Sequence, residues 1–483
     1  MAIHKMYEWL NEVLKTSRKS FSREATFRWF VVIVLGLMIR QDHLGVTSII
    51  RELEIDPRWY ETMLHFFRSN AWNLESLTKW WIQVVACYGG LFSENGMPIL
   101  VGDGVKQGKE ARKMPCVKRL HQESETVSKA SYIFGHMFGA IGVLVGNAGK
   151  LFCVPLSMRI HDGDAQIKRW NGQTNGGESH VVRIIREASA AAKTLCRKSI
   201  LLLDRYYLSV PALSTLLDEE TLAGKPLLSL VMRAKSNPAA YEEPLRKHKL
   251  GRPPLKGDKV KVKDLFTTRI QMFKEAVVTM YGKDESVLYY CCDLLWGQKL
   301  YQKLRFVLVL QGETRSIFVS TDLTLTPEQI LRLYGYRFKI ECSFREFKQV
   351  IAGFAYRFWS FSMPRLNRFS KSGYDPLESV TTDTDKKRIT NAFNAIQGFV
   401  IVATVAFGLL QLCALRFALE INAPNFRWLR SRTNQTPSEA TTAHFMGKTI
   451  FRMIVFRLDL PILRFIRERQ LHNIDDERVE VSA

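Results

Sequence analysis

The N-terminal part of the chain has the apolar pattern of a series of amphipathic helices. Apolar residues recur at helical spacing up to about residue 95, and signals for β-strands are few there. Residues 46–53 and 57–68 predict two short helices around the tight turn Glu54-Ile55-Asp56. Such a pair fits a helix-turn-helix that reads DNA, and it fits a plain helical bundle equally well.

Beyond residue 95 the pattern changes to short apolar runs that predict β-strands. The first runs cover residues 98–102, 132–145 and 151–160, and the sequence Gly146-Asn147-Ala148-Gly149 predicts a turn between the last two. An alanine-rich helix is expected over residues 179–197. The continuous apolar run 200–203 is typical of a strand buried on both faces of a sheet. Strands, a helix and a further strand predict an α/β domain.

The interval between Asp204 and Glu341 is far longer than one connection requires, so it should contain a module of its own. Apolar runs at 228–232, 276–281, 287–295, 304–311 and 316–320 make that module largely β. We therefore expect a helical N-terminal domain (1–95), a first core part (96–234), a β-rich insertion (235–325), a second core part (326–420) and a C-terminal region (421–483). An acidic tail follows Asp475.

A single helix is predicted from Pro327 to about Gly353, because Thr326 and Gln329 can form a capping box at its start. Its apolar face consists of Leu333, Ile340, Phe344, Phe347 and Ile351. The adjoining face combines one acid with cations and a phenol: Tyr334, Arg337, Glu341, Arg345 and Lys348. This face suits a phosphodiester site. The simpler interpretation is a solvated face with an ion pair between Glu341 and Arg345.

Charge favours a polyanionic partner. The chain has 69 Lys and Arg against 47 Asp and Glu, a formal net charge of +22, which points to nucleic acid. No signal peptide is evident, and the apolar run 392–415 is interrupted by Gln397, Thr404 and Gln411, so we expect a buried core helix there and not a membrane span. The eight cysteines lack zinc-type pairs and are interpreted as reduced thiols of a cytoplasmic protein.

Two further acids, Asp103 and Asp204, are each expected at the C-terminal end of an apolar strand. Carboxylates at the ends of neighbouring strands can converge, and together with Glu341 they would give hard oxygen ligands for Mg²⁺ or Mn²⁺. Paired metals of this kind catalyse phosphoryl transfer. Taken alone, each Asp is better explained as a turn residue that ends a strand.

These residues carry a family resemblance. The spacing Tyr334-x2-Arg337-x3-Glu341-x6-Lys348 resembles the YREK signature of bacterial insertion-sequence transposases of the DDE class, in the group named insertion-sequence four. The order of the acids also fits, with Asp103 in Val101-Gly102-Asp103-Gly104 and Asp204 in Leu203-Asp204-Arg205-Tyr206-Tyr207. The resemblance implies a ribonuclease H-like catalytic core interrupted by a β insertion, which is the layout expected from the apolar runs.

The resemblance also implies residue roles. Asp103, Asp204 and Glu341 would be the catalytic, metal-binding triad, while Tyr334, Arg337, Arg345 and Lys348 would bind DNA. Relatives hold a flipped base against a Trp of the insertion, and Trp296 is the candidate here, although a Trp at the end of a strand is more often a core residue.

The expected activity is therefore cut-and-paste DNA transposition by metal-dependent strand cleavage and strand transfer. The partners would be transposon-end DNA, bound by residues 1–95, and target DNA, with a homodimer in the synaptic complex to which residues 421–483 contribute. The expected place is the nucleoid of a bacterial cytoplasm, with no membrane partner. The alternatives are a catalytically silent DNA-binding protein derived from a transposase, a stand-alone metal nuclease, and a membrane-associated protein that rests on residues 392–415 alone.

Two other motifs have simple explanations. The basic stretch 246–263 contains Gly251-Arg252-Pro253, which could enter a minor groove or be a solvated loop. His161-Asp162-Gly163-Asp164 could suggest a metal site, but a turn after a strand explains it better.

Overall fold

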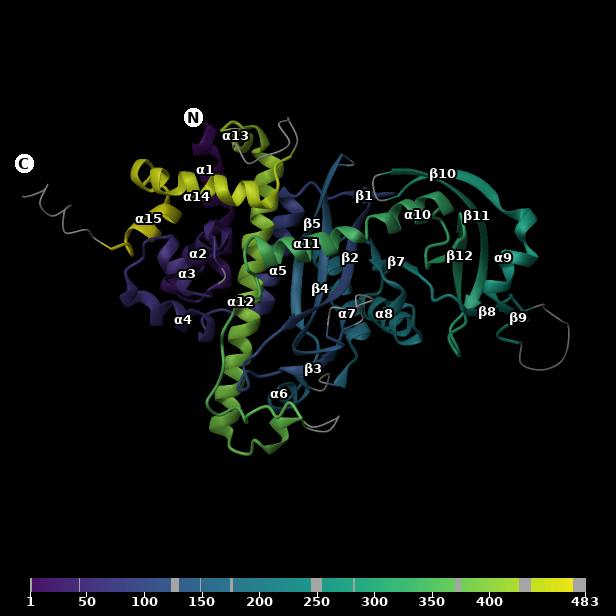
Figure 1. The fold of residues 1–483 in the computed structure, drawn as a ribbon, viewed down its shortest axis with the longest axis horizontal. Coiled ribbons are helices and arrows are strands. Elements are labelled where there is room, and N and C mark those ends of the chain that lie inside the picture. Colours follow the sequence, from purple (N-terminus) through teal and green to yellow (C-terminus); the bar gives the residue numbers. More distant parts are fainter. Residues whose placement is uncertain are drawn as a thin grey trace, which may run out of the picture.

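The chain combines a mostly helical N-terminal region with one large mixed sheet (Figure 1). A computed structural model describes residues 2–42, 44–122, 130–147, 149–173, 177–244, 254–280, 283–369, 375–424 and 436–471. Residues 246–253 of the basic stretch, which include Gly251-Arg252-Pro253, and the acidic tail after Asp475 therefore lie outside the described residues. The mixed α/β class agrees with the prediction.

The N-terminal region is helical, as predicted. Its helices are α1 Ala2–Thr16, α2 Glu24–Ile39, α3 Thr47–Glu52, α4 Tyr60–Arg68 and α5 Leu74–Tyr88, with short 3-10 turns at Ser17–Ser20 and Pro57–Trp59. The α3 and α4 helices are the two short helices expected around Glu54-Ile55-Asp56. The α2 helix is apolar on every side and is buried from Val31 to Ile39, as expected for a helix enclosed by others.

Five strands form the part of the sheet that carries the two aspartates. β5 Lys150–Ile160, β4 Tyr132–Asn147 and β2 Met97–Gly108 are antiparallel neighbours, and β6 Ser199–Leu203 and β7 Leu228–Arg233 continue the sheet in parallel with β2. α7 His180–Leu195 packs on β2 and β4, and its predicted start is confirmed because Ser179 caps it. The smaller elements are β1 Ser93–Glu94, β3 Lys118–His121, α6 Ala165–Trp170 and α8 Val210–Ala223.

The β-rich segment after β7 extends the same sheet. β13 Thr314–Ser320 pairs antiparallel with β7, and the order continues through β12 Gln302–Gln311, β11 Lys283–Trp296, β8 Ala239–Tyr241 and β9 Lys259–Lys261. β10 Lys274–Met280 forms a hairpin with β11, and the short helix α9 Leu265–Thr268 precedes it. The predicted β module is thus hydrogen-bonded to β7, which neighbours β6, the strand that Asp204 follows.

The predicted single helix after Thr326 is two helices, α10 Pro327–Gly335 and α11 Phe338–Gln349. The capping box of Thr326 and Gln329 is present, and all five residues of the predicted apolar face are buried. The break has a local cause. Gly335 is a poor helix former, and the amides of Tyr336 and Arg337 bond to carbonyls only three residues back, which tightens the turn.

The long helix α12 Asp383–Arg416 is the core helix expected from its apolar run. It is the one helix among the described residues that is long and apolar enough to cross a membrane, yet 94% of its apolar window is buried inside the protein. It packs on β5, α2 and α4 (Figure 1). The C-terminal helices α13 Ala418–Asn422, α14 Glu439–Phe456 and α15 Pro461–Arg467 return to the N-terminal helices. All eight cysteines are free thiols.

Candidate active site

The pairing of β2 with β6 brings two acids side by side. Val101 is level with Leu202 in this parallel pair, and Asp103 and Asp204 each stand two residues further along. The sequence predicted that Asp103 ends its strand, and this prediction is wrong. Instead β2 continues to Gly108, because its other edge remains paired with β4 up to Gly135. Asp204 follows β6 directly, as predicted.

Arg337 joins this strand edge to the helices that follow Thr326. Its Nη1 donates to Asp103 Oδ2 at 3.0 Å, and its Nη2 donates to Glu341 one turn further along α11. The hydroxyl of Tyr334 donates to Asp204 Oδ1 at 3.3 Å. The structure therefore brings together five of the predicted site residues. The simpler interpretation paired Glu341 with Arg345, whereas the structure pairs Glu341 with Arg337.

The break between α10 and α11 positions these contacts. Tyr334 lies in the last turn of α10, and Arg337 is the residue that immediately precedes α11. The tight turn between them lets one side chain approach Asp204 while the other reaches between Asp103 and Glu341. A continuous helix would have presented them as a simple stripe.

The electrostatics show three carboxylates sharing one cation. Burial raises the pKa of Asp103 to about 6, and the charges of Asp204 and Glu341 act in the same direction, against Arg337 and the amide of Gly104. Burial acts to lower the pKa of Arg337, but the surrounding acids and Tyr334 outweigh it and raise that pKa. Arg337 is therefore a permanently charged counterion at the centre of the acids.

The donor set suits a hard divalent cation, since Asp103, Asp204 and Glu341 offer carboxylate oxygens. Among the described residues, however, no cluster of three His, Cys, Asp or Glu side chains is arranged to hold a metal ion as it stands. Arg337 lies between Asp103 and Glu341 and occupies that space.

The other predicted site residues lie further away. Lys348, near the end of α11, donates to the carbonyl of Lys106 on β2 at 3.5 Å. Arg345 is exposed and pairs with its neighbour Glu346 at 2.8 Å, so it does not join the acids.

Trp296 stands at the end of β11, half-buried against the core. The register that links Asp293, Arg305, Ser320 and Val231 puts Trp296 level with the beginning of β7. Asp204 instead follows the residue paired with Met232, near the end of β7. The structure therefore does not bring Trp296 to the acids. Its packing agrees with the alternative that it is a core residue.

A buried hydrogen-bonded chain behind the acids was not foreseen from the sequence. The hydroxyl of Tyr207 lies 2.8 Å from His180 Nε2, His180 Nδ1 lies 2.8 Å from His161 Nδ1, and His161 Nε2 lies 2.7 Å from Glu187 Oε1. Burial raises the pKa of Tyr207, and Asp103 and Asp204 contribute. Burial lowers the pKa of His180 to about 3, so its ring is neutral at pH 7.

Two glycines make room for this chain. A side chain at Gly104 would meet His180 Nε2 at 2.8 Å, and one at Gly139, its partner across β2 and β4, would collide with the ring of His161. Gly104 directly follows Asp103. The sequence therefore offered one sign of this space, a glycine beside a candidate catalytic acid. It did not indicate which ring would fill the space.

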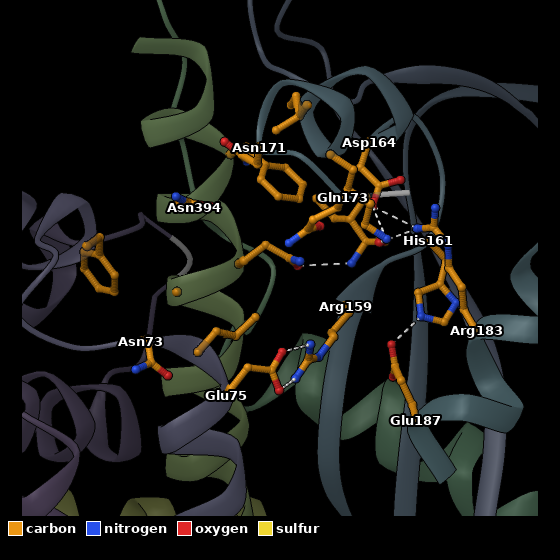
Figure 2. Close-up of a pocket in the computed structure, with 18 of the residues that line it drawn as sticks. Asn73, Glu75, Arg159, His161, Asp164, Asn171, Gln173, Arg183, Glu187 and Asn394 are labelled. Carbon is orange, nitrogen blue, oxygen red and sulfur yellow. Dashed lines mark hydrogen bonds and ion pairs between the residues drawn. The ribbon is translucent and has the colours of Figure 1, made fainter. Parts of the chain in front are cut away.

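At its Glu187 end, this chain of hydrogen bonds borders a polar cavity of about 970 Å³ (Figure 2). Figure 2 shows His161, directly after β5, and Glu187 of α7 facing it, with Arg159 bound by both carboxylate oxygens of Glu75 from α5. Asp164 is buried at the same wall and pairs with Arg183 at 2.9 Å. The segment His161-Asp162-Gly163-Asp164 is the predicted turn after a strand, and two of its side chains are built into this network.

No protein-family model, curated protein or solved structure matches this chain.

Proposed function

We propose that this protein is a metal-dependent DNA transposase of the DDE class, as the resemblance to the insertion-sequence four group implies. The observation that carries the proposal is the meeting of Asp103, Asp204 and Glu341 around Arg337. Parallel pairing of β2 with β6 and the helix pair α10 and α11 bring these residues together from three distant parts of the sequence. Its substrates would be transposon-end DNA and target DNA at the nucleoid of a bacterium.

The fold supports the same proposal. Three antiparallel strands, β5, β4 and β2, followed by the parallel strands β6 and β7 support the ribonuclease H-like core that the resemblance implies. The net charge of +22 supports a nucleic-acid substrate.

The residues have separable roles in this proposal. Asp103, Asp204 and Glu341 would hold Mg²⁺ or Mn²⁺, which when bound would activate the attacking oxygen and stabilise the leaving one. Arg337 neutralises the acids in the DNA-free protein and would turn to a DNA phosphate on binding, since its guanidinium suits both kinds of oxygen. Tyr334 orients Asp204, and Lys348 would contact a phosphate further along the same DNA strand.

The experiment compares cleavage and binding on DNA that carries the sequences flanking the gene. Asp103→Asn, Asp204→Asn and Glu341→Gln should each remove strand cleavage in Mg²⁺, with binding in a mobility-shift assay within about threefold of wild type. Glu346→Gln, on the same helix, is the matched control and should cleave normally. Full cleavage by any of the three variants would remove that residue from the triad.

The second candidate is a catalytically silent DNA-binding protein, favoured by the ion pairs that tie Arg337 to Asp103 and Glu341. In that case the acids are a structural network, and the wild-type protein binds the flanking DNA without cutting it in either Mg²⁺ or Mn²⁺.

A further inference from the structure

The segment that follows α11 has an ordered alternation of buried and exposed side chains. Residues 356–361, here called the strap, belong to no helix or strand. Three of its side chains face the interior and three face the surface: Tyr356, Phe358 and Ser360 are buried, and Arg357, Trp359 and Phe361 are exposed. The outward face is therefore one cation and two aromatic rings, with Trp359 45% and Phe361 80% exposed.

The inward side chains fix the strap in place. The Tyr356 hydroxyl lies 2.7 Å from His136 Nδ1, and the two rings stack with centroids 5.7 Å apart. Phe358 packs against Phe67 of α4, with ring centroids 5.4 Å apart, and against Phe399 of α12, with ring centroids 6.3 Å apart. The exposure of the outward rings is thus imposed by an anchored backbone, and burying them would require the strap to leave these contacts.

The strap is also tied to the strand that carries Asp103. The ammonium group of Lys109, directly after β2, donates to the carbonyls of Phe354 and Tyr356 at 2.6 and 3.1 Å. The amide of Ser360 donates to the carbonyl of Lys113 at 3.1 Å. Lys109 is six residues beyond Asp103, which is about 20 Å along a strand.

A hollow of about 700 Å³ lies between the strap, α4 and the start of α12. It brings together three exposed arginines and three exposed aromatic side chains: Arg68, Arg357, Arg388, Tyr60, Trp359 and Phe361. Among its described lining residues there is no Asp or Glu. The α4 side of the hollow belongs to the two short helices, α3 and α4, whose sequence fits either a helix-turn-helix that reads DNA or a plain helical bundle.

We propose that this hollow binds an unpaired stretch of DNA, with bases stacked on Trp359 and Phe361 and phosphates held by Arg68, Arg357 and Arg388. Aromatic rings in a positively charged groove are the general design for single-stranded nucleic acid, because every base has a face that can stack. The two rings touch edge to face, with centroids 4.5 Å apart and planes inclined by 74°, so each ring presents its own face and would stack a separate base. The identity of the polyanion as DNA rests on the proposed function.

The test measures binding without cleavage. Fluorescence anisotropy in EDTA would follow a labelled 12-nucleotide oligothymidine and a labelled duplex of the same length. Trp359→Ala and Phe361→Ala should each lose about tenfold affinity for the single strand, which is within the range expected for one stacked base. Their affinity for the duplex should change less than twofold. Trp359→Phe should keep most of the affinity, and Arg357→Ala should flatten the salt dependence by about one ion.

Leu222→Ala on α8 is the matched control, because Leu222 is as exposed as Phe361 and lies outside the hollow. Thermal melting of every variant checks the fold, and these surface changes should leave it intact. An unchanged affinity of the double variant Trp359→Ala/Phe361→Ala for oligothymidine would overturn the proposal, as would equal losses on single strand and duplex. If wild type binds the single strand in this way but does not cleave flanking DNA, the transposase proposal alone is wrong.

Discussion

At the scale of single residues, the site is a balance between like charges and one arginine. Asp103 is 22% exposed and stands beside two other carboxylates, so its ionised form is held mainly by Arg337. The types and order of these residues could be predicted, because acids after strands and a spaced helix motif are visible in the sequence. The place of Arg337 between Asp103 and Glu341 could not, because it depends on how α11 docks against β2.

The chain from Tyr207 to Glu187 could not be predicted for a related reason. His161 and His180 come from the end of a strand and the start of a helix, and each has an ordinary local explanation. They meet because Gly104 and Gly139 leave space on neighbouring strands, which is a property of sheet register. No local pattern in the sequence reports that register.

The pKa of Asp103 gives a prediction about stability and pH. A carboxyl whose pKa is raised from 3.8 to about 6 in the folded state contributes stability below pH 4, and this contribution is lost as the pH rises through 6. The ionised group therefore costs the fold about 3 kcal/mol at pH 8, since one unit of pKa difference corresponds to about 1.4 kcal/mol. Asp103→Asn should raise the melting temperature at pH 8 by a few degrees while abolishing cleavage, and the gain should shrink at pH 4.5.

Differential scanning fluorimetry across pH 4.5 to 8 measures this directly, with Asp162→Asn as the control because Asp162 is a half-exposed carboxylate that pairs with Lys118. In addition, Mg²⁺ should stabilise wild type more than Asp103→Asn, since a ligand that binds the folded state stabilises it. A variant that melts lower than wild type at pH 8 would mean that the bond to Arg337 outweighs the burial of the charge.

At the scale of elements, the sequence predicted the structure reliably where neighbouring residues alone determine it. The capping box of Thr326 and Gln329 formed as predicted, and the strands β4, β5, β6 and β12 lie where apolar runs placed them. The break between α10 and α11 was missed because the apolar face continues in phase across Gly335. The end of β2 was missed because pairing with β4 prolongs the strand beyond its apolar run.

The start of α10 offers a prediction for one element. The Thr326 hydroxyl accepts from the amide of Gln329, and the Gln329 side chain accepts from the amide of Thr326. Thr326→Ala should lower the free energy of unfolding by about 1 kcal/mol, as expected for the loss of a helix cap, whereas Thr326→Ser should stay near wild type. Urea denaturation measures both. If the serine variant is as unstable as the alanine variant, the methyl group and not the cap is responsible.

At the scale of the whole molecule, the sheet brings together segments that lie far apart in the sequence. β13 pairs with β7 and β7 pairs with β6, so the β-rich segment extends the sheet beside the strand that Asp204 follows. The last helices return to the first ones, with the Tyr7 hydroxyl bonded to the carbonyl of Met446 at 3.3 Å. Long-range pairings of this kind are set by tertiary packing, which periodicity along the chain does not report.

Assembly is the remaining prediction at this scale. One candidate active site among the described residues would serve one DNA end, whereas excision requires two ends held together. The end of α14 exposes the apolar side chains of Val455, Phe456 and Leu458, which gives the C-terminal region a surface for self-association. We expect a monomer without DNA and a dimer on paired end DNA.

Multi-angle light scattering on the protein with and without flanking DNA measures the stoichiometry. Phe456→Ser should reduce dimer formation on paired ends at least tenfold while leaving the affinity for one end unchanged, because Phe456 is 68% exposed and its loss removes only contact area between protomers. Leu222→Ala serves again as the exposed control. A monomeric complex on paired ends, under conditions in which both ends are excised, would show that a single protomer handles both and that the C-terminal surface has another role.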